Sequence, residues 1–198
     1  MKEKIQAKIN GAKMWKSITL ICVLILVVSF FVGIIIKNDI TKFILGASGI
    51  ATIVSLIVFF GFRNNILKCM KILEEAGITL DEVAKDLEGA KTIGKVRKVV
   101  CGDKFFTLPS PFCVFSYKEI LWVYLKKTTT HDGSTGATTT SKTVIFCTAH
   151  GKKFSANISW KVAKEFLEEN REKFLPELIV GYKMKYNKQY KELVKKYK

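Results

Sequence analysis

The chain has 198 residues, of which 48% are hydrophobic, and a formal net charge of +16. This length allows one globular domain with its own core in addition to a membrane segment. Its five cysteines are odd in number and irregularly spaced, which excludes the disulfide framework of a small secreted protein and favours reduced thiols in the cytoplasm.

The positive charge is concentrated at the two ends of the chain. Residues 1–16 carry five Lys against one Glu, a net +4, and residues 183–198 carry seven Lys against one Glu, a net +6. Residues 64–182 carry 18 basic and 14 acidic side chains, a net +4. Because the central part is nearly balanced, no nucleic acid is expected as a partner, and the basic ends indicate a surface partner.

Two uncharged apolar stretches follow the basic N-terminal segment 1–16. They cover residues 17–36 and 43–62, and a helix of either length spans about 30 Å, the thickness of the bilayer hydrocarbon core. The few residues between them cannot cross a membrane, so residues 17–63 are predicted to form an antiparallel transmembrane hairpin. A cleaved signal peptide is the alternative, but the first stretch is long for one and the second follows at once.

Positive charge flanks the predicted hairpin on the side of the two long tails. Five lysines precede the first stretch and Arg63, Lys68 and Lys71 follow the second, whereas the loop offers only Lys37 and Lys42. The positive-inside rule therefore predicts a multi-pass protein of the cell membrane with both termini in the cytoplasm. Neither stretch contains Asp, Glu, Lys, Arg or His, which disfavours a transporter or a proton path.

Small residues are frequent in the second stretch, where they let helices approach closely in lipid. They predict packing against the first stretch, near Ser29 and Gly33. Self-association of two chains through Gly46 and Gly49 is the other interpretation.

Residues 64–90 have helical spacing and form a predicted helical connector. A first helix over 64–76 ends at Gly77, and Thr79 and Glu82 have the spacing of a capping box that opens a short second helix. The acidic side chains of that second helix are interpreted as its solvated face: Asp81, Glu82 and Asp86.

The hydrophobic period changes from helical to alternating after residue 90. Predicted strands cover residues 93–101, 103–108, 112–117, 120–127, 142–148 and 153–158. The Thr-, Gly- and Ser-rich residues 128–141 are predicted to be a mobile hairpin loop. Ser159 caps a predicted amphipathic helix that runs to about Phe174 and ends before Pro176.

Residues 91–182 are therefore predicted to be an α+β domain, a small antiparallel β-barrel or sandwich capped by a C-terminal helix. This order of elements resembles the pleckstrin-homology-like domains of bacterial membrane-anchored proteins. The run from Ser116 to Ile120 is similar to the start of the corresponding strand in such domains, and Leu175–Pro176 with residues 178–182 resembles two-span membrane proteins of Gram-positive bacteria. The resemblance covers about residues 93–175 and supplies no catalytic residues. It implies binding of lipids, peptides or other proteins.

Lysines mark two candidate binding regions. Lys126, Lys127 and Lys142 flank the Thr-rich loop, and in a barrel they would gather at its mouth to recognise a phosphate-bearing or acidic partner. Lysines that only solubilise strand ends are the alternative.

Residues 183–198 form a predicted amphipathic helix whose lysines suit an anionic membrane surface: Lys183, Lys185, Lys188, Lys191, Lys195 and Lys196. The alternative is a tail helix that packs on its own domain with a solvated lysine face.

Catalytic and metal-binding patterns are weak. Cys147 and His150 are three residues apart, with Cys101 and Cys113 as further candidate ligands, but no C-x-x-C pair occurs, so no metal or cofactor is expected. His150 is the local candidate base for a Cys147 nucleophile, and no third group that orients the base is suggested. The P-loop motif is absent from the sequence.

The sequence therefore predicts a membrane-anchored cytoplasmic binding or scaffold module, not an enzyme, that engages anionic lipid head groups or a protein partner. Two alternatives stay open. One is a membrane enzyme that uses Cys147 and His150. The other is a nucleic-acid-binding membrane anchor, which the near-balanced charge of residues 64–182 disfavours.

Overall fold

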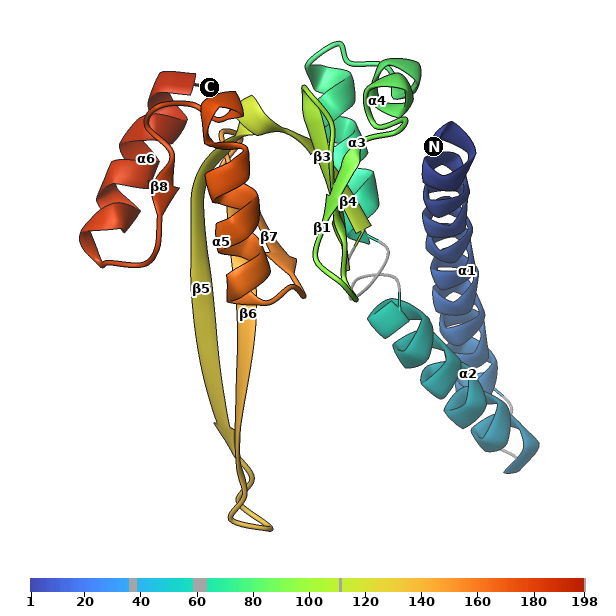
Figure 1. Cartoon of the computed structure of the whole chain (residues 1–198). Helices are drawn as coiled ribbons and strands as arrows, with labels where there is room; N and C mark the ends of the chain where they lie inside the picture. Colours follow the sequence, from blue (N-terminus) through green and yellow to red (C-terminus); the bar gives the residue numbers. More distant parts are fainter. Residues whose placement is uncertain (36–38, 59–63, 111, 198) are drawn as a thin grey trace. The chain divides into compact units, whose positions relative to one another are not determined.

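The computed structural model describes residues 1–35, 39–58, 64–110 and 112–197 (Figure 1). The chain forms two compact units. One consists of residues 3–68, which contain the apolar helices, and the other of residues 69–198 together with the first two residues.

The apolar unit is built on two helices, α1 (Lys2–Ile35) and α2 (Asp39–Val58). The predicted basic segment 1–16 is the first part of α1 and continues directly into its apolar part. The Thr52 hydroxyl on α2 donates to the Cys22 carbonyl oxygen on α1 at 3.0 Å, and the Thr19 hydroxyl on α1 donates to the Ser55 carbonyl oxygen at 3.3 Å. Buried hydroxyl groups therefore join the two helices, as expected for helices packed in an apolar environment.

The small residues of α2 divide between two surfaces. Ser48 and Thr52 are buried, and a Cβ atom built on Gly49 would lie 3.9 Å from the Leu26 Cδ1 atom of α1. Gly46 is exposed, and no atom lies within 4 Å of the position of its missing Cβ. The face with Gly49 packs within the helix pair, whereas Gly46 takes no part in that packing.

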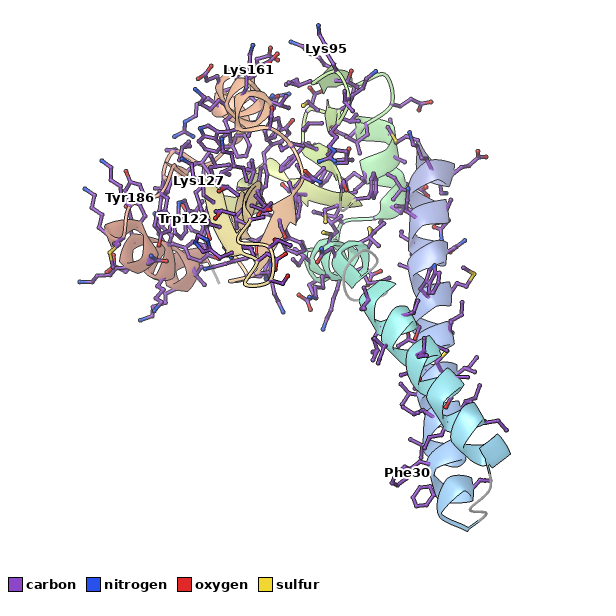
Figure 2. All side chains as sticks on the ribbon, turned by 90° about the horizontal axis from the view of Figure 1, so that it is seen from below. Phe30, Lys95, Trp122, Lys127, Lys161 and Tyr186 are labelled. Atoms are coloured by element: carbon purple, nitrogen blue, oxygen red, sulfur yellow. The ribbon has the colours of Figure 1, made fainter. Side chains whose placement is uncertain are left out.

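The outward side chains of α1 are apolar in the part that follows the basic segment 1–16. Lys2–Val32 is the one segment of the described residues that is long and apolar enough to cross a membrane, and the apolar part of α2, Ile44–Ile57, is shorter. Only 11% of the most apolar part of α1 is buried, and side chains such as Phe30 project away from the helix pair (Figure 2). This length and composition suit a membrane span or an N-terminal signal sequence. The predicted span ends at residues 36 and 59–62 lie outside the described residues.

Two short helices open the second unit, and both have the predicted ends. They are α3 (Asn64–Glu75) and α4 (Leu80–Asp86). Gly77, with a φ of 72°, follows α3 in the left-handed conformation that ends a helix, and the Thr79 hydroxyl oxygen accepts the Glu82 backbone N–H at 3.2 Å. Cys69 and Ile72 of α3 belong to the main core, so the second half of α3 is part of the domain.

Asp86 is not the solvated side chain that the sequence indicated. Its carboxylate accepts the backbone N–H groups of Asp103, Lys104 and Phe105 at distances of 3.0 to 3.2 Å. A Cβ atom on Gly102 would overlap this carboxylate. Asp86 therefore fixes the turn that leads into the third strand.

Eight strands form two four-stranded sheets (Figure 1). The first sheet has the antiparallel order β1 (Lys91–Ile93), β2 (Val99–Cys101), β3 (Phe105–Pro109) and β4 (Phe112–Ser116). A 3-10 turn, Tyr117–Glu119, leads into the second sheet. Its order is β7 (Lys153–Ala156), β6 (Thr138–Thr148), β5 (Ile120–His131) and β8 (Ile179–Val180). The β8 strand pairs with β5 in parallel, which no sequence pattern indicated.

The main core is aromatic and contains residues of both sheets and of α5 (Trp160–Glu169). The ring centroids of Phe106 and Phe166 lie 4.8 Å apart, and those of Phe115 and Phe154 lie 4.9 Å apart. The Ser159 hydroxyl oxygen accepts the Val162 N–H at 3.2 Å, so the predicted cap of α5 is confirmed. The helix ends at Glu169 and a 3-10 turn, Arg171–Lys173, follows, so the prediction of one helix to Phe174 is wrong.

A second apolar cluster lies on the other face of β5 and β6. Alternate residues of these strands, such as Trp122 and Cys147, point away from the main core and are covered by α6 (Lys185–Tyr197), which lies along β5 and β8 in Figure 1. Tyr190 of α6 is buried there, and Tyr186 and Leu193 pack against the cluster. The apolar stripe of the tail helix therefore packs on its own domain and is not available for insertion into lipid.

The predicted strand 93–101 is interrupted by a turn. It is divided into β1 and β2, which pair antiparallel with Ile93 opposite Val99. Gly94 has a φ of 96°, and Val96 is 93% exposed at the tip. The alternation of apolar and basic residues suggested one strand, but the positive φ of Gly94 reverses the chain instead.

The predicted mobile loop 128–141 is mostly a β-ribbon. In the ribbon, β5 and β6 stay paired from Thr128 opposite Ser141 to His131 opposite Thr138, and the ribbon extends beyond the rest of the sheet in Figure 1. β-branched Thr favours extended backbone, and the prediction of a loop did not take this preference into account. The turn itself is limited to residues 132–137, where the Asp132 carboxylate accepts the Ser134 backbone N–H at 2.9 Å.

Candidate functional site: a basic groove at the start of α5

A groove of about 850 Å³ lies where three parts of the domain meet. Residues 94–97 of the β1–β2 turn form one wall, and residues 157–165 at the start of α5 form another. Lys142 of β6 completes the lining. The site therefore depends on segments that are far apart in the sequence.

The charge of the groove is strongly positive. Lys95, Arg97, Lys142 and Lys161 line it, and Glu165 is the one acidic residue of the lining. Figure 2 shows Lys95 on the β1–β2 turn and Lys161 on α5 extending outward at the same edge of the domain. No ion pair within the described residues involves any of the four basic side chains. Their charge remains available to an anionic ligand.

The β1–β2 turn is held in place on α5 and on the chain before it. Arg97 Nη1 donates to the Asn157 carbonyl oxygen at 2.9 Å. A Cβ atom on Gly94 would lie 3.0 Å from the Arg97 carbonyl oxygen and 3.2 Å from Val162 Cγ1, closer than side-chain packing normally allows. Only glycine fits both the positive φ and this close approach, so Gly94 positions the basic side chains of the turn.

Val96 gives the groove an apolar tip. Its side chain is 93% exposed and stands between Lys95 and Arg97 in the turn. The groove therefore combines basic side chains with one exposed aliphatic side chain at its edge.

The three lysines predicted at the mouth of a barrel do not form one cluster. Lys142 lines the groove, and Lys127 is its direct cross-strand partner in the β5–β6 pair. Side chains two residues apart on a strand share a face of the sheet. Lys127 and Lys142 therefore lie on the same face as Val123 and Val144, which belong to the main core. Lys126 pairs with Thr143 and lies on the opposite face, so its predicted place beside Lys127 and Lys142 is wrong.

The tail lysines belong to another surface. All six are exposed, and they precede or belong to α6 on the far side of the second sheet. Lys196 Nζ pairs with Glu177 Oε1 at 2.7 Å. None of the six lines the groove.

Sequence reasoning missed three residues of the groove: Lys95, Arg97 and Lys161. The first two were assigned to a continuous strand, and Lys161 was assigned to the solvated face of a helix. The signal that could have found the turn is Gly94 followed by four residues with three positive charges. No local pattern indicates that Lys161 and Lys142 lie at the same cavity.

The surroundings of Cys147 and His150 do not favour nucleophilic chemistry. Cys147 is fully buried in the cluster under α6, and burial raises the pKa of its thiol to about 12. His150 Nε2 lies 3.5 Å from Glu119 Oε1, so the imidazole is engaged with a carboxylate. In the part of the chain that the structure describes, no group of three metal-ligating side chains is present.

Comparison with known proteins identifies a family. The DUF6709 family, described as a domain of unknown function, matches residues 61–190, which extend from α3 into the first part of α6. No curated protein and no solved structure matches the chain. The chain belongs to the DUF6709 family.

Proposed function

We propose that this protein is a membrane-anchored cytoplasmic binding module whose basic groove takes an anionic lipid head group. In this proposal α1 and α2 both span the cell membrane and both termini lie in the cytoplasm. The domain is pleckstrin-homology-like, and the groove between the β1–β2 turn and α5 is its ligand site.

The order of elements supports the pleckstrin-homology-like assignment. Seven strands, β1 to β7, pair antiparallel with their neighbours in two sheets, and the amphipathic α5 follows β7 directly. Phe166 of α5 packs into the aromatic core of the sheets. This is the strand-then-helix order that the resemblance implies, and the Ser116–Ile120 segment leads into β5, the fifth strand of that order.

The exposed apolar surface of the helix pair supports the membrane assignment. Large apolar side chains such as Leu24 and Phe31 on α1 and Ile50 on α2 are more than half exposed. A contiguous surface of this kind is stable in lipid and aggregates in water. The lysines before α1 and the basic residues after α2 favour the cytoplasmic side for both tails.

The groove itself carries the proposal. Four basic side chains meet at a cavity of about 850 Å³ beside one carboxylate, and Val96 stands exposed at its edge. Positive charge recognises a phosphate-bearing head group, and an aliphatic tip enters the interface around it. An acidic protein segment lacks the apolar layer that Val96 would enter, which is why the lipid is favoured over a protein partner.

The test uses the full chain in nanodiscs of phosphatidylcholine. Capture of these nanodiscs by vesicles of phosphatidylcholine, with or without phosphatidylglycerol, is measured at low and high salt. We expect capture only by the anionic vesicles, weakening with salt. Replacing Lys95, Lys142 and Lys161 with Gln should reduce capture about 100-fold, at about 1 kcal/mol for each lysine.

The matched control makes the same change in net charge at three lysines outside the groove. Lys85, Lys118 and Lys152 are equally exposed and lie outside the groove, and their replacement with Gln should leave capture nearly unchanged. Equal losses in the two triple variants would show that only net charge matters and would reject the groove as a site. Capture that never depends on anionic lipid would move the search to an acidic protein partner, by cross-linking in native membranes.

A further inference from the structure

The outward face of α6 carries a row of lysines, and an exposed methionine lies directly before the helix. Lys188, Lys191 and Lys195 follow each other at intervals of three and four residues, so they share one face of the helix, and Met184 directly precedes the helix. All four are exposed, and Met184 is 84% exposed. The packed residues, centred on Tyr190, lie on the opposite face. One exposed carboxylate, Glu192, adjoins the row, four residues after Lys188 and three before Lys195.

The chain just before α6 is held rigidly, so the exposure of Met184 is built into the fold. Gly181 has a φ of 89°, its N–H donates to the Val123 carbonyl oxygen at 2.8 Å, and its carbonyl oxygen accepts the Trp122 indole N–H at 2.7 Å. The Tyr182 ring stacks on the Trp122 ring with centroids 5.8 Å apart. Tyr182 is nevertheless 55% exposed, so two apolar side chains near the start of α6 face solvent.

We infer that this face of α6 docks on the anionic surface of the bilayer in which the protein is anchored. The three lysines contact head groups, and Met184 enters the interfacial layer at the N-terminal end of the helix. The inference rests on the membrane anchoring in the proposed function, but it uses a different surface from the groove. The sequence left open whether residues 183–198 contact an anionic surface or pack on their own domain. Because the apolar side of the helix packs on the sheet, the contact proposed here is made by the opposite, lysine-bearing face.

Charge complementarity and covalent attachment to the membrane anchor favour the bilayer surface over a soluble partner for this face of α6. With Glu192 as the one carboxylate of residues 183–198, the three lysines leave this face positively charged, which matches a surface of diffuse negative charge. Each lysine contributes about fivefold to the ratio of docked to undocked domain. Because the domain is covalently joined to the anchor, its local concentration at the bilayer is high, and a weak contact is sufficient to hold it.

The experiment places a reporter at Met184 in the full chain. A Met184→Cys variant in a Cys22→Ala background is labelled with an environment-sensitive fluorophore and reconstituted in vesicles of phosphatidylcholine, with or without phosphatidylglycerol. We expect emission to shift to shorter wavelength only with phosphatidylglycerol, and nitroxide lipids labelled near the head group to quench it. The same reporter in a Thr130→Cys variant, on the exposed ribbon, should not shift.

Replacing Lys188, Lys191 and Lys195 with Gln should abolish the shift, and circular dichroism should stay unchanged because all three side chains are exposed. The Gln variants of the groove should leave the shift intact, which separates this inference from the proposed ligand site. An aqueous emission maximum at Met184 in anionic vesicles would overturn the inference. So would a shift that depends on protein density and not on lipid charge, because it would indicate contact between two copies of the chain.

Discussion

The hydroxyl of Tyr190 donates to the carbonyl oxygen of Thr148 at 2.8 Å, and this bond ties α6 to the end of β6. Tyr190 is buried beside Trp122, with ring centroids 5.7 Å apart. Replacing Tyr190 with Phe should lower the free energy of unfolding by about 1 kcal/mol, since the Thr148 carbonyl keeps its bond from the Gly151 N–H. Replacement with Ala should cost about 3 kcal/mol or more, because it also leaves a cavity.

Denaturant unfolding of the full chain in detergent, followed by tryptophan fluorescence, measures this difference. Tyr186→Phe is the matched control, because Tyr186 is only half-buried on the same helix and no hydrogen bond of its hydroxyl is found among the described contacts. An equal effect of the two Phe substitutions would mean that the Tyr190 hydroxyl bond contributes nothing to the attachment of α6.

Asp86 is predicted to be one of the most sensitive polar positions of the domain. Its carboxylate accepts three backbone N–H groups, from residues 103 to 105. Asp86→Ala leaves these donors unpaired and should destabilise the domain by about 2 to 3 kcal/mol. Gly102→Ala should be comparably damaging, because its Cβ would overlap the carboxylate and lie 2.8 Å from the Asp86 carbonyl oxygen.

Thermal unfolding by circular dichroism is a suitable measurement for both variants. Asp103→Ala serves as the control, since that side chain is 99% exposed and should be replaceable with little effect. If Asp86→Ala unfolds like Asp103→Ala, the carboxylate does not fix the turn.

The pair formed by Glu119 and His150 predicts a pH dependence of stability. Burial raises the pKa of the Glu119 carboxyl above its ordinary value of 4.5, and the nearby His150 opposes part of this shift. The folded state therefore holds the Glu119 proton more tightly than the unfolded state. The contribution of this group to stability is complete below pH 4.5 and is lost as the pH rises through the raised pKa.

Glu119→Gln removes that titration. We expect the free energy of unfolding of the Gln variant to fall less than that of the unchanged protein between about pH 4 and pH 7. Glu119 Oε2 is buried and without a hydrogen-bond partner in the described structure, which is why charging the group is unfavourable. Parallel pH profiles for the two proteins would contradict the assignment to Glu119.

The domain cysteines are predicted to be unreactive in the folded protein. Burial raises the pKa of the Cys101 thiol to about 11 and that of Cys147 to about 12. Since the thiolate is the reactive form, a water-soluble maleimide should not label either residue at neutral pH until the protein unfolds. Met184→Cys should be labelled at once and serves as the positive control. Rapid labelling of Cys147 in the native protein would revive the alternative of an enzyme that uses Cys147 and His150.

Local features of this protein could be predicted from the sequence because their causes are local. Gly77 ends α3, and Thr79 and Ser159 cap the helices that follow them, since each such contact is made within three residues. The alternation along β5 also placed Trp122 and Val123 on opposite faces, as the two apolar clusters confirm. It placed Ile120 with Trp122 and Leu121 with Val123, which is wrong, because a bulge between Ile120 and Trp122 puts Ile120 in the main core and Leu121 beside Trp122. The apolar character of α1 follows in the same way from composition.

Features that depend on distant segments were decided only by the tertiary structure. Lys95, Lys142 and Lys161 meet at one groove, and Asp86 reaches the turn before β3, because the folding of the sheets brings these segments together. Likewise, the amphipathic pattern of residues 183–198 fitted both lipid and the domain. The apolar outer face of β5 and β6 decided between them, because docking α6 there buries the apolar surfaces of both the helix and the sheet, whereas a helix bound to lipid would leave the sheet surface in water.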